Sequence, residues 1–83
     1  MKIYFKSSNG SMREIADVEN PETKQEFCDI TSRIMQEFCD ERSFTIYYTR
    51  IWEEPVNGVL MTAFDVGSHT EFFYTDVPIS RYK

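Results

Sequence analysis

The stretch that decides the fold is residues 20–42, NPETKQEFCDITSRIMQEFCDER. Its apolar residues recur at helical spacing and form one stripe, which consists of Phe27, Ile30, Thr31, Ile34, Met35 and Phe38. Asn20 is a favoured N-cap residue, and Pro21 suits the first helical position because no intrahelical bond needs its missing N–H. Arg42 suits the negative end of the helix dipole, but no glycine follows it. The pattern therefore predicts one long amphipathic helix over residues 21–42.

Aromatic and β-branched runs outside this stretch predict the strands of a sheet. In chain order, the predicted strands cover residues 2–6, 12–18, 43–52, 59–66 and 70–77. The strand over 12–18 is the least regular, because Glu14 and Ile15 break its two-residue alternation. An extended loop is the alternative for that segment.

Glycine-containing sequences predict the turns. Asn9-Gly10 and Asn57-Gly58 tolerate positive φ and favour hairpins. The second pair belongs to a turn expected over residues 53–58, in which Pro55 bars further strand pairing. A further turn is expected at residues 67–69, and residues 79–83 are expected to fray. Short turns between the last three strands predict an antiparallel meander.

Together these elements predict an α+β fold that occupies the whole chain, residues 1–83, as a single domain in the order β(β)αβββ. We expect a single antiparallel sheet of four to five strands with one long amphipathic helix packed on one face. One helix covers only one face, yet the last three strands carry apolar residues on both faces. We therefore expect an apolar face for a partner or a second copy; strong twist with covering Tyr and Arg side chains is the alternative.

The composition argues against several classes of function. The chain has 14 acidic and 9 basic residues, a net charge of −5, so direct nucleic-acid binding is disfavoured, because phosphate contacts need a basic surface. Cys28 and Cys39 lie about 16 Å apart along the predicted helix, too far for a disulfide, and are interpreted as small buried side chains. No apolar run is long enough for a membrane span or a signal peptide, so we expect no membrane association and a cytoplasmic location.

No cluster of residues specifies a reaction, and we expect a non-enzymatic protein without cofactor or metal. His69, the one histidine, is expected in a solvated turn. The acidic pairs Asp40-Glu41 and Glu53-Glu54 are sequence neighbours, whose side chains diverge instead of converging on a substrate. The three glycines lie in predicted turns and form no phosphate-binding loop.

Most of the acidic excess lies on the predicted helix and its approach. The candidate partner-binding residues there are Glu22, Glu26, Asp29, Glu37 and Asp40. The candidates outside the helix are Tyr47, Trp52, Glu53, Glu54 and Tyr74. Tyr and Trp are frequent anchors of protein interfaces, and we expect Glu53 and Glu54 at a loop tip beside them. The alternative for the helix acids is a solvated face that keeps a small protein soluble.

In its size, acidic charge and lack of catalytic motifs, the chain is similar to small acidic proteins of phages and mobile elements, anti-CRISPR and related host-takeover inhibitors among them. This similarity implies an inhibitor or regulator whose carboxylates occlude the basic, nucleic-acid-binding surface of a host protein. Two further hypotheses stay open. One is a homodimeric structural or accessory module that buries its open sheet face. The other is a small ligand- or RNA-binding domain with bases stacked on Tyr47, Trp52 and Tyr74.

Overall fold

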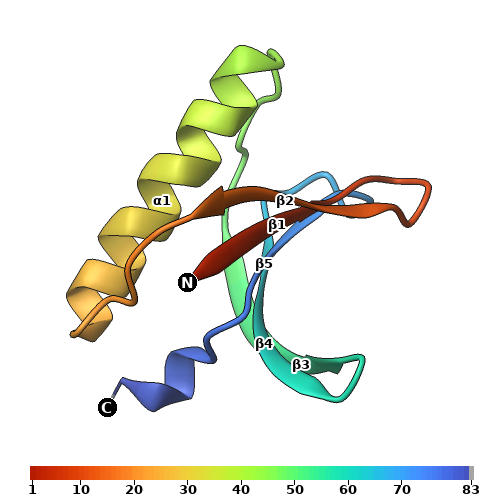
Figure 1. Ribbon diagram of the computed structural model, residues 1–83. Helices are drawn as coiled ribbons and strands as arrows, with labels where there is room; N and C mark the ends of the chain where they lie inside the picture. The colour runs from red at the N-terminus through yellow and green to blue at the C-terminus, as the bar shows by residue number, and fades with distance from the viewer. Residues whose placement is uncertain (83) are drawn as a thin grey trace.

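The computed structural model describes residues 1–82. Its strands are β1 (Lys2–Lys6), β2 (Met12–Asp17), β3 (Arg50–Val56), β4 (Val59–Asp65) and β5 (Phe72–Thr75). Its helices are α1 (Lys24–Glu41) and the 3-10 helix η1 (Ile79–Arg81). The strands form one antiparallel sheet in the order β2-β1-β5-β4-β3, and α1 lies across one face of it (Figure 1). The predicted α+β fold is confirmed, with five strands in the order ββαβββ.

The helix begins later than predicted. Thr23, not Asn20, is the N-cap, and its Oγ1 accepts a hydrogen bond from the backbone N–H of Glu26 at 3.1 Å. The Glu26 carboxylate accepts in turn from the N–H of Glu22 at 3.0 Å. This arrangement closely resembles a capping box, which satisfies two backbone donors where Asn20 would satisfy one. Pro21 is buried but precedes the helix.

The helix ends at Glu41 in a Schellman motif that uses serine in place of glycine. The N–H of Phe44 donates to the carbonyl of Cys39 at 2.9 Å, and the N–H of Ser43 donates to that of Asp40 at 3.3 Å. Ser43 has a φ of 58°, the left-handed conformation that glycine usually provides. The ending was hard to predict because a serine takes this position.

The prediction for the third strand was wrong in its bounds. Residues 44–49 are not a regular strand, and β3 instead runs through the segment predicted as a turn, up to Val56. Pro55 is tolerated because β3 is an edge strand, where a missing N–H can face away from the ladder. Only Asn57-Gly58, both at positive φ, make the turn to β4.

The remaining strands differ from the predictions mainly at their ends. β2 is a genuine strand, one residue shorter than predicted, and its irregular alternation is explained by a register shift opposite Ile3 and Tyr4. Ile15 is the additional residue of this β-bulge, which explains why the two-residue pattern fails there. β4 ends at Asp65, and β5 is shorter than the predicted 70–77.

The main core lies between α1 and the face of the sheet that we call the helix face. Its fully buried residues include Ile3, Phe27, Phe64 and Phe73. The predicted stripe of α1 is confirmed, although Ile30 and Ile34 are only partly buried. Both cysteines are free, as expected, and Cys39 is buried while Cys28 is half-buried.

The C-terminal segment packs on this core and is not frayed as predicted. Tyr82 is 8% exposed, and its ring lies 5.6 Å from that of Phe27. The buried Thr62 hydroxyl accepts from the N–H of Ile79 at 2.7 Å and donates to the carbonyl of Val77 at 2.8 Å. The prediction for Lys83 lies outside the described residues.

The opposite face of the sheet, which we call the far face, has a smaller core of its own. Met61, Ala63 and Tyr74 are buried there. The partly buried residues around them are Tyr4, Met12, Trp52, Val56 and Phe72. The Trp52 and Phe72 rings pack edge to face at 6.0 Å. The large exposed apolar residues all fall between residues 44 and 60: Phe44, Tyr47, Tyr48, Ile51, Val59 and Leu60.

Candidate functional site

The acidic residues predicted as a partner surface are exposed on and just before α1. Glu37 pairs with Arg33 at 3.2 Å. Among residues 1–82, no basic nitrogen lies within 4.0 Å of the other four carboxylates, those of Glu22, Glu26, Asp29 and Asp40. Their negative charge is therefore not compensated within this part of the chain.

Neutral side chains hold two of these carboxylates in place. The side-chain amide of Gln25 donates to Asp29 at 2.8 Å, and that of Gln36 donates to Asp40 at 2.8 Å. Both pairs have the i, i+4 spacing that brings side chains together on one helix face. A hydrogen bond from an amide orients a carboxylate without cancelling its charge, so Asp29 and Asp40 are ordered anions.

Glu26 has a structural task instead. Its carboxylate accepts from the N–H of Glu22 and so helps to begin the helix. A charge reversal at Glu26 would therefore disturb the cap as well as the surface. Asp29 and Asp40 are better positions at which to test the charge of this face.

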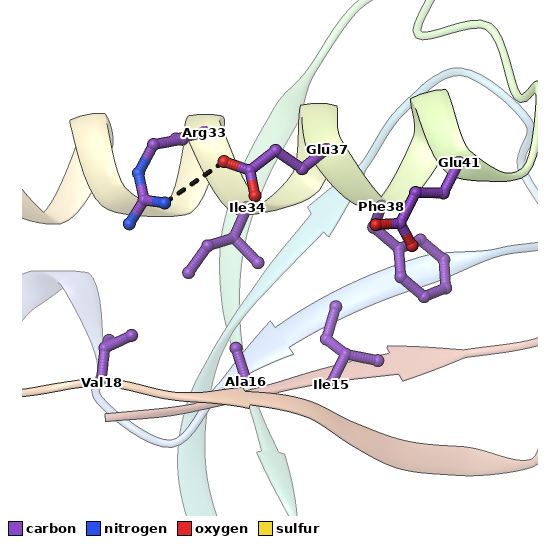
Figure 2. Close-up of a pocket in the computed structure, with 8 residues that line it drawn as sticks. All are labelled: Ile15, Ala16, Val18, Arg33, Ile34, Glu37, Phe38 and Glu41. Carbon is purple, nitrogen blue, oxygen red and sulfur yellow. Dashed lines mark hydrogen bonds and ion pairs between the residues drawn. The ribbon is translucent and has the colours of Figure 1, made fainter.

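A shallow groove of about 300 Å³ runs between α1 and β2. Figure 2 shows Ile15, Ala16 and Val18 on one side of it, facing Ile34 and Phe38 of the helix. The ion pair of Arg33 and Glu37 lies at its rim, together with Glu41. The groove has an apolar floor and a charged rim, and the bulge at Ile15 supplies part of the floor.

Glu53 and Glu54 do not form the predicted loop tip, because both belong, together with Trp52, to the edge strand β3. Glu53 and Glu54 point to opposite faces of the sheet. Glu53 accepts from the N–H of Ser80 at 2.9 Å, and this bond holds the pKa of Glu53 below its ordinary value.

Glu54 joins two of the predicted aromatic residues on the far face. Its Oε1 accepts from Trp52 Nε1 at 3.2 Å and from the Tyr74 hydroxyl at 3.0 Å. Burial and the neighbouring Glu54 carboxylate raise the pKa of Tyr74 to about 12. The structure thus brings Trp52, Glu54 and Tyr74 together, but on the face opposite to α1. Tyr74 is 4% exposed, which leaves its ring no free face for a base or a partner.

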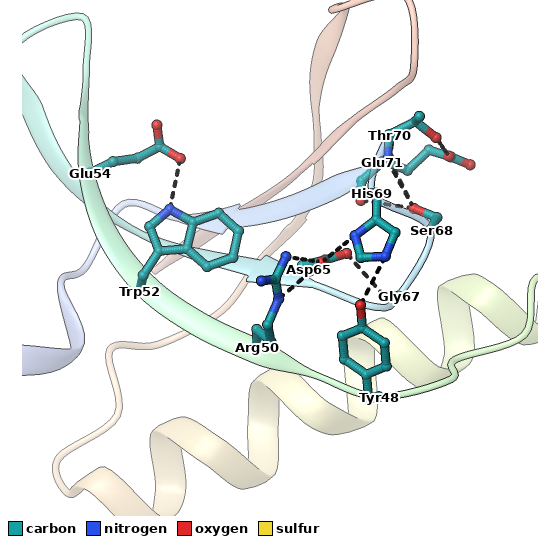
Figure 3. Close-up of polar contacts among 10 residues, drawn as sticks. All are labelled: Tyr48, Arg50, Trp52, Glu54, Asp65, Gly67, Ser68, His69, Thr70 and Glu71. Atoms are coloured by element: carbon teal, nitrogen blue, oxygen red, sulfur yellow. Dashed lines mark hydrogen bonds and ion pairs between the residues drawn. The ribbon is translucent and has the colours of Figure 1, made fainter.

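Sequence analysis missed a polar cluster around Asp65 (Figure 3). The Asp65 side chain is fully buried and accepts from Arg50 Nη2 at 2.7 Å and from the N–H of Gly67 at 2.9 Å. His69 Nδ1 lies 3.4 Å from the same carboxylate, and His69 Nε2 lies 3.0 Å from the Tyr48 hydroxyl. Burial alone would raise the pKa of Asp65, but these donors outweigh it and hold that pKa below its ordinary value.

The cluster fastens the irregular segment before β3 to the turn after β4. The N–H of Tyr47 donates to the carbonyl of Val66 at 3.1 Å, so Tyr48 and Thr49 lie between this bond and the Arg50–Asp65 pair. Gly67 has a φ of 96°, and a Cβ there would lie 2.9 Å from that of Tyr47. Two signals could have indicated the cluster: Asp65-Val-Gly67, a typical turn sequence, and Arg50, the one charged residue in the run 44–52.

The cluster holds Tyr47 on the surface, where its side chain is 74% exposed. Of the predicted aromatic anchors, Tyr47 is thus the most accessible. It lies near the end of β4, within the exposed apolar stretch of residues 44–60, and not beside Tyr74.

Three further observations concern membrane spans, metal sites and similarity to known proteins. Within residues 1–82, no helix is both long and apolar enough to cross a membrane. The same residues contain no group of three or more His, Cys, Asp or Glu side chains placed to hold a metal ion. No family model matches the chain, and comparisons with curated proteins and with solved structures gave no match either.

Proposed function

We propose that the protein is a non-enzymatic protein-binding module that engages the basic surface of another protein through the outer face of α1. The observation that carries this proposal is the exposure of the carboxylates on and just before α1, together with their lack of basic neighbours within residues 1–82. Glu22, Asp29 and Asp40 are exposed and without a basic neighbour in residues 1–82, and Gln25 and Gln36 order two of them. Ordered, uncompensated anions lose little conformational entropy when they meet Lys or Arg, which favours binding.

The chemistry of the partner follows from this charge. A net charge of −5 attracts a basic surface over a distance of about a Debye length and repels phosphate groups. A groove lined by Lys and Arg, of the kind that binds nucleic acid, fits best. The finer proposal is an inhibitor or regulator of the phage or mobile-element type, active in the cytoplasm of a host cell, that occupies such a groove.

The test is a capture experiment from nuclease-treated lysate with the tagged wild type and a D29K/D40K variant. Both positions are exposed and outside the cap, so the variant should keep its helix content. We expect a protein that binds the wild type at about 0.1 M salt, is released at about 1 M salt, and is absent with the variant.

The matched control is E14K, because Glu14 is an exposed acid on β2 whose partner Tyr4 lies on the far face. E14K changes the net charge in the same direction but leaves α1 unchanged, so it should capture the same protein. Equal capture by wild type and D29K/D40K would reject the helix face as the binding surface.

A further inference from the structure

A second surface lies along the outer edge of β3, which is the edge of the sheet opposite to β2. Among residues 1–82, β3 pairs with β4 alone, so its other side has no neighbouring strand. Val56 and Val59 close a two-residue turn, and such closing residues hydrogen-bond to each other. Backbone groups then alternate, so those of Trp52 and Glu54 face β4, while those of Ile51, Glu53 and Pro55 face outward. The missing N–H of Pro55 falls on the outward side, where it disrupts no bond to β4.

The side chains along this edge are complementary to themselves. On the far face β3 presents, in order, Arg50, Trp52 and Glu54: a cation, an aromatic ring and an anion. If a second copy pairs antiparallel about a two-fold axis at Trp52, each Arg50 lies opposite a Glu54 of the other copy. Residues directly opposite each other have Cβ atoms about 4.5–5.5 Å apart, so both charge pairs and the two indole rings come into contact.

The single chain leaves these groups available. Glu54 accepts only from the neutral Trp52 and Tyr74 donors, and no basic nitrogen in residues 1–82 lies within 4.0 Å of it. The Arg50 side chain is 60% exposed and uses Nε and Nη2 for Asp65 (Figure 3), which leaves Nη1 for a further acceptor. A hollow of about 370 Å³ lies against Arg50, Ile51 and Trp52.

The same register also pairs the backbone and the other face. Ile51 and Glu53 of the two copies face each other with their outward N–H and C=O groups, as a hydrogen-bonded pair. On the helix face, the 44% exposed Ile51 lies diagonal to Ile51 and Pro55 of the second copy, within reach of apolar contact. Pro55 and the two glutamates disfavour pairing with arbitrary strands, while the Arg50–Glu54 spacing admits this one.

We propose that a second copy of this chain binds along β3 and continues the sheet across a two-fold axis at Trp52. Such an axis is perpendicular to the sheet, so both α1 helices lie on the same face and present their carboxylates together. The contact is short compared with obligate interfaces, and the dimer is therefore concentration-dependent. This inference does not rest on the acidic face, since none of its residues belongs to α1.

The first test is a charge swap measured by sedimentation equilibrium. E54R and R50E each place like charges opposite one another, and each should weaken the dimer at least about 10-fold. The double variant R50E/E54R restores opposite charges and should return the dissociation constant to within about threefold of the wild type. A wild type that stays monomeric at about 1 mM, or a dimer that E54R leaves unchanged, would overturn the proposal.

The second test does not depend on Arg50, whose loss also affects Asp65. In this register the two Trp52 residues form a pair without backbone hydrogen bonds, with Cα atoms about 4.5 Å apart, which a disulfide can bridge. W52C in a C28S background should therefore form a covalent dimer on mild oxidation. Cys39 can remain, because burial, with Asp40 beside it, raises the pKa of its thiol and disfavours reaction.

The matched control is V59C, an exposed position in β4 at the hairpin end and away from the proposed axis. It should crosslink at least about 10-fold more slowly than W52C. Equal rates for the two variants would mean random collision and would reject this register. Far-UV circular dichroism of W52C and V59C establishes that both variants compared are folded.

Discussion

The helix face of the sheet is covered by α1, whereas on the far face the side chains of the sheet pack only against one another within residues 1–82. On the helix face, Phe64 and Phe73 are each 1% exposed beneath the rings of α1. On the far face three hydrophobic residues and Asp65 are buried, and the larger side chains there are aromatic rings with polar groups or are partly exposed. Tyr74 and Trp52 direct their donors to Glu54, and Arg50 pairs with Asp65. Side chains on a sheet face that no helix covers can still be buried when the polar groups around them hydrogen-bond to one another.

The substitution with the largest expected effect on this comparison is F27A. Phe27 is fully buried between α1 and the sheet, and its truncation should cost about 4 kcal/mol of unfolding free energy, measured by urea denaturation. Native domains typically have an unfolding free energy of about 5–15 kcal/mol, so this loss would be a large part of it. The matched variant F72A removes the same group from the partly buried far face and should cost about 1.5 kcal/mol. Equal losses would show that the two faces contribute alike.

The second test removes the buried charge of the far face. D65N should lower the unfolding free energy at neutral pH by about 2 kcal/mol, because the bond to Arg50 loses its ionic character. The folded pKa of Asp65 is depressed, so its contribution is present above the unfolded pKa and is lost as pH falls through the folded pKa.

Urea melts of wild type and D65N at a series of pH values should therefore converge in acid. D29N is the control, since Asn can still accept from Gln25 at an exposed site, and it should change stability by less than about 0.5 kcal/mol. A gap between wild type and D65N that persists at low pH would contradict this account.

The third test concerns the Tyr74–Glu54 bond. Y74F should cost about 1 kcal/mol at neutral pH, because one hydrogen bond to a carboxylate is lost. The folded pKa of about 12 exceeds the ordinary 10.0, so the wild type should lose stability, at most about 2 kcal/mol, as pH rises between these values. Y74F should lack this part of the loss of unfolding free energy at alkaline pH. Identical dependences of the unfolding free energy on alkaline pH in the two proteins would reject this role of the Tyr74–Glu54 bond.

The smallest test strengthens the layer that covers the helix face. S43G should stabilise the protein by about 0.5 kcal/mol, because glycine adopts the positive φ of the helix C-terminus without a steric cost. S32G, in the middle of α1, should instead destabilise by about 0.5 kcal/mol. Thermal melts of the two variants should thus shift in opposite directions, and a shift of S43G to lower temperature would contradict the motif.

Several features were predictable because they depend on neighbours in the chain. The stripe from Phe27 to Phe38 places one helix, and the Asn57-Gly58 turn places one hairpin. The Thr23–Glu26 pair also carried the correct helix start, but the more conspicuous Asn20-Pro21 obscured it. The exposed acids of α1 follow from the same periodicity, and whether they bind a partner stays a prediction.

Apart from the two helix ends, the main misses involve contacts between separate elements of the fold. Glu53-Glu54-Pro55 has the composition of a turn, yet β4 and an edge position make it a strand. The cluster of Arg50, Asp65 and His69 forms only when the start of β3 lies beside the turn after β4. The place of Tyr74 beside Glu54 follows from the alignment of β5, β4 and β3 across the sheet, which no local pattern encodes.

The sequence by itself therefore determined the α+β class, the helix with its acidic surface, and the tight turn of the β3–β4 hairpin. These depend on interactions within about one helical turn or one hairpin, whose energies are local. Only the tertiary structure decided which strand lies at the edge, which face Glu54 occupies, and which aromatic rings are buried. Those outcomes depend on the register of strands far apart in the chain, where a shift of one residue would turn every side chain to the other face.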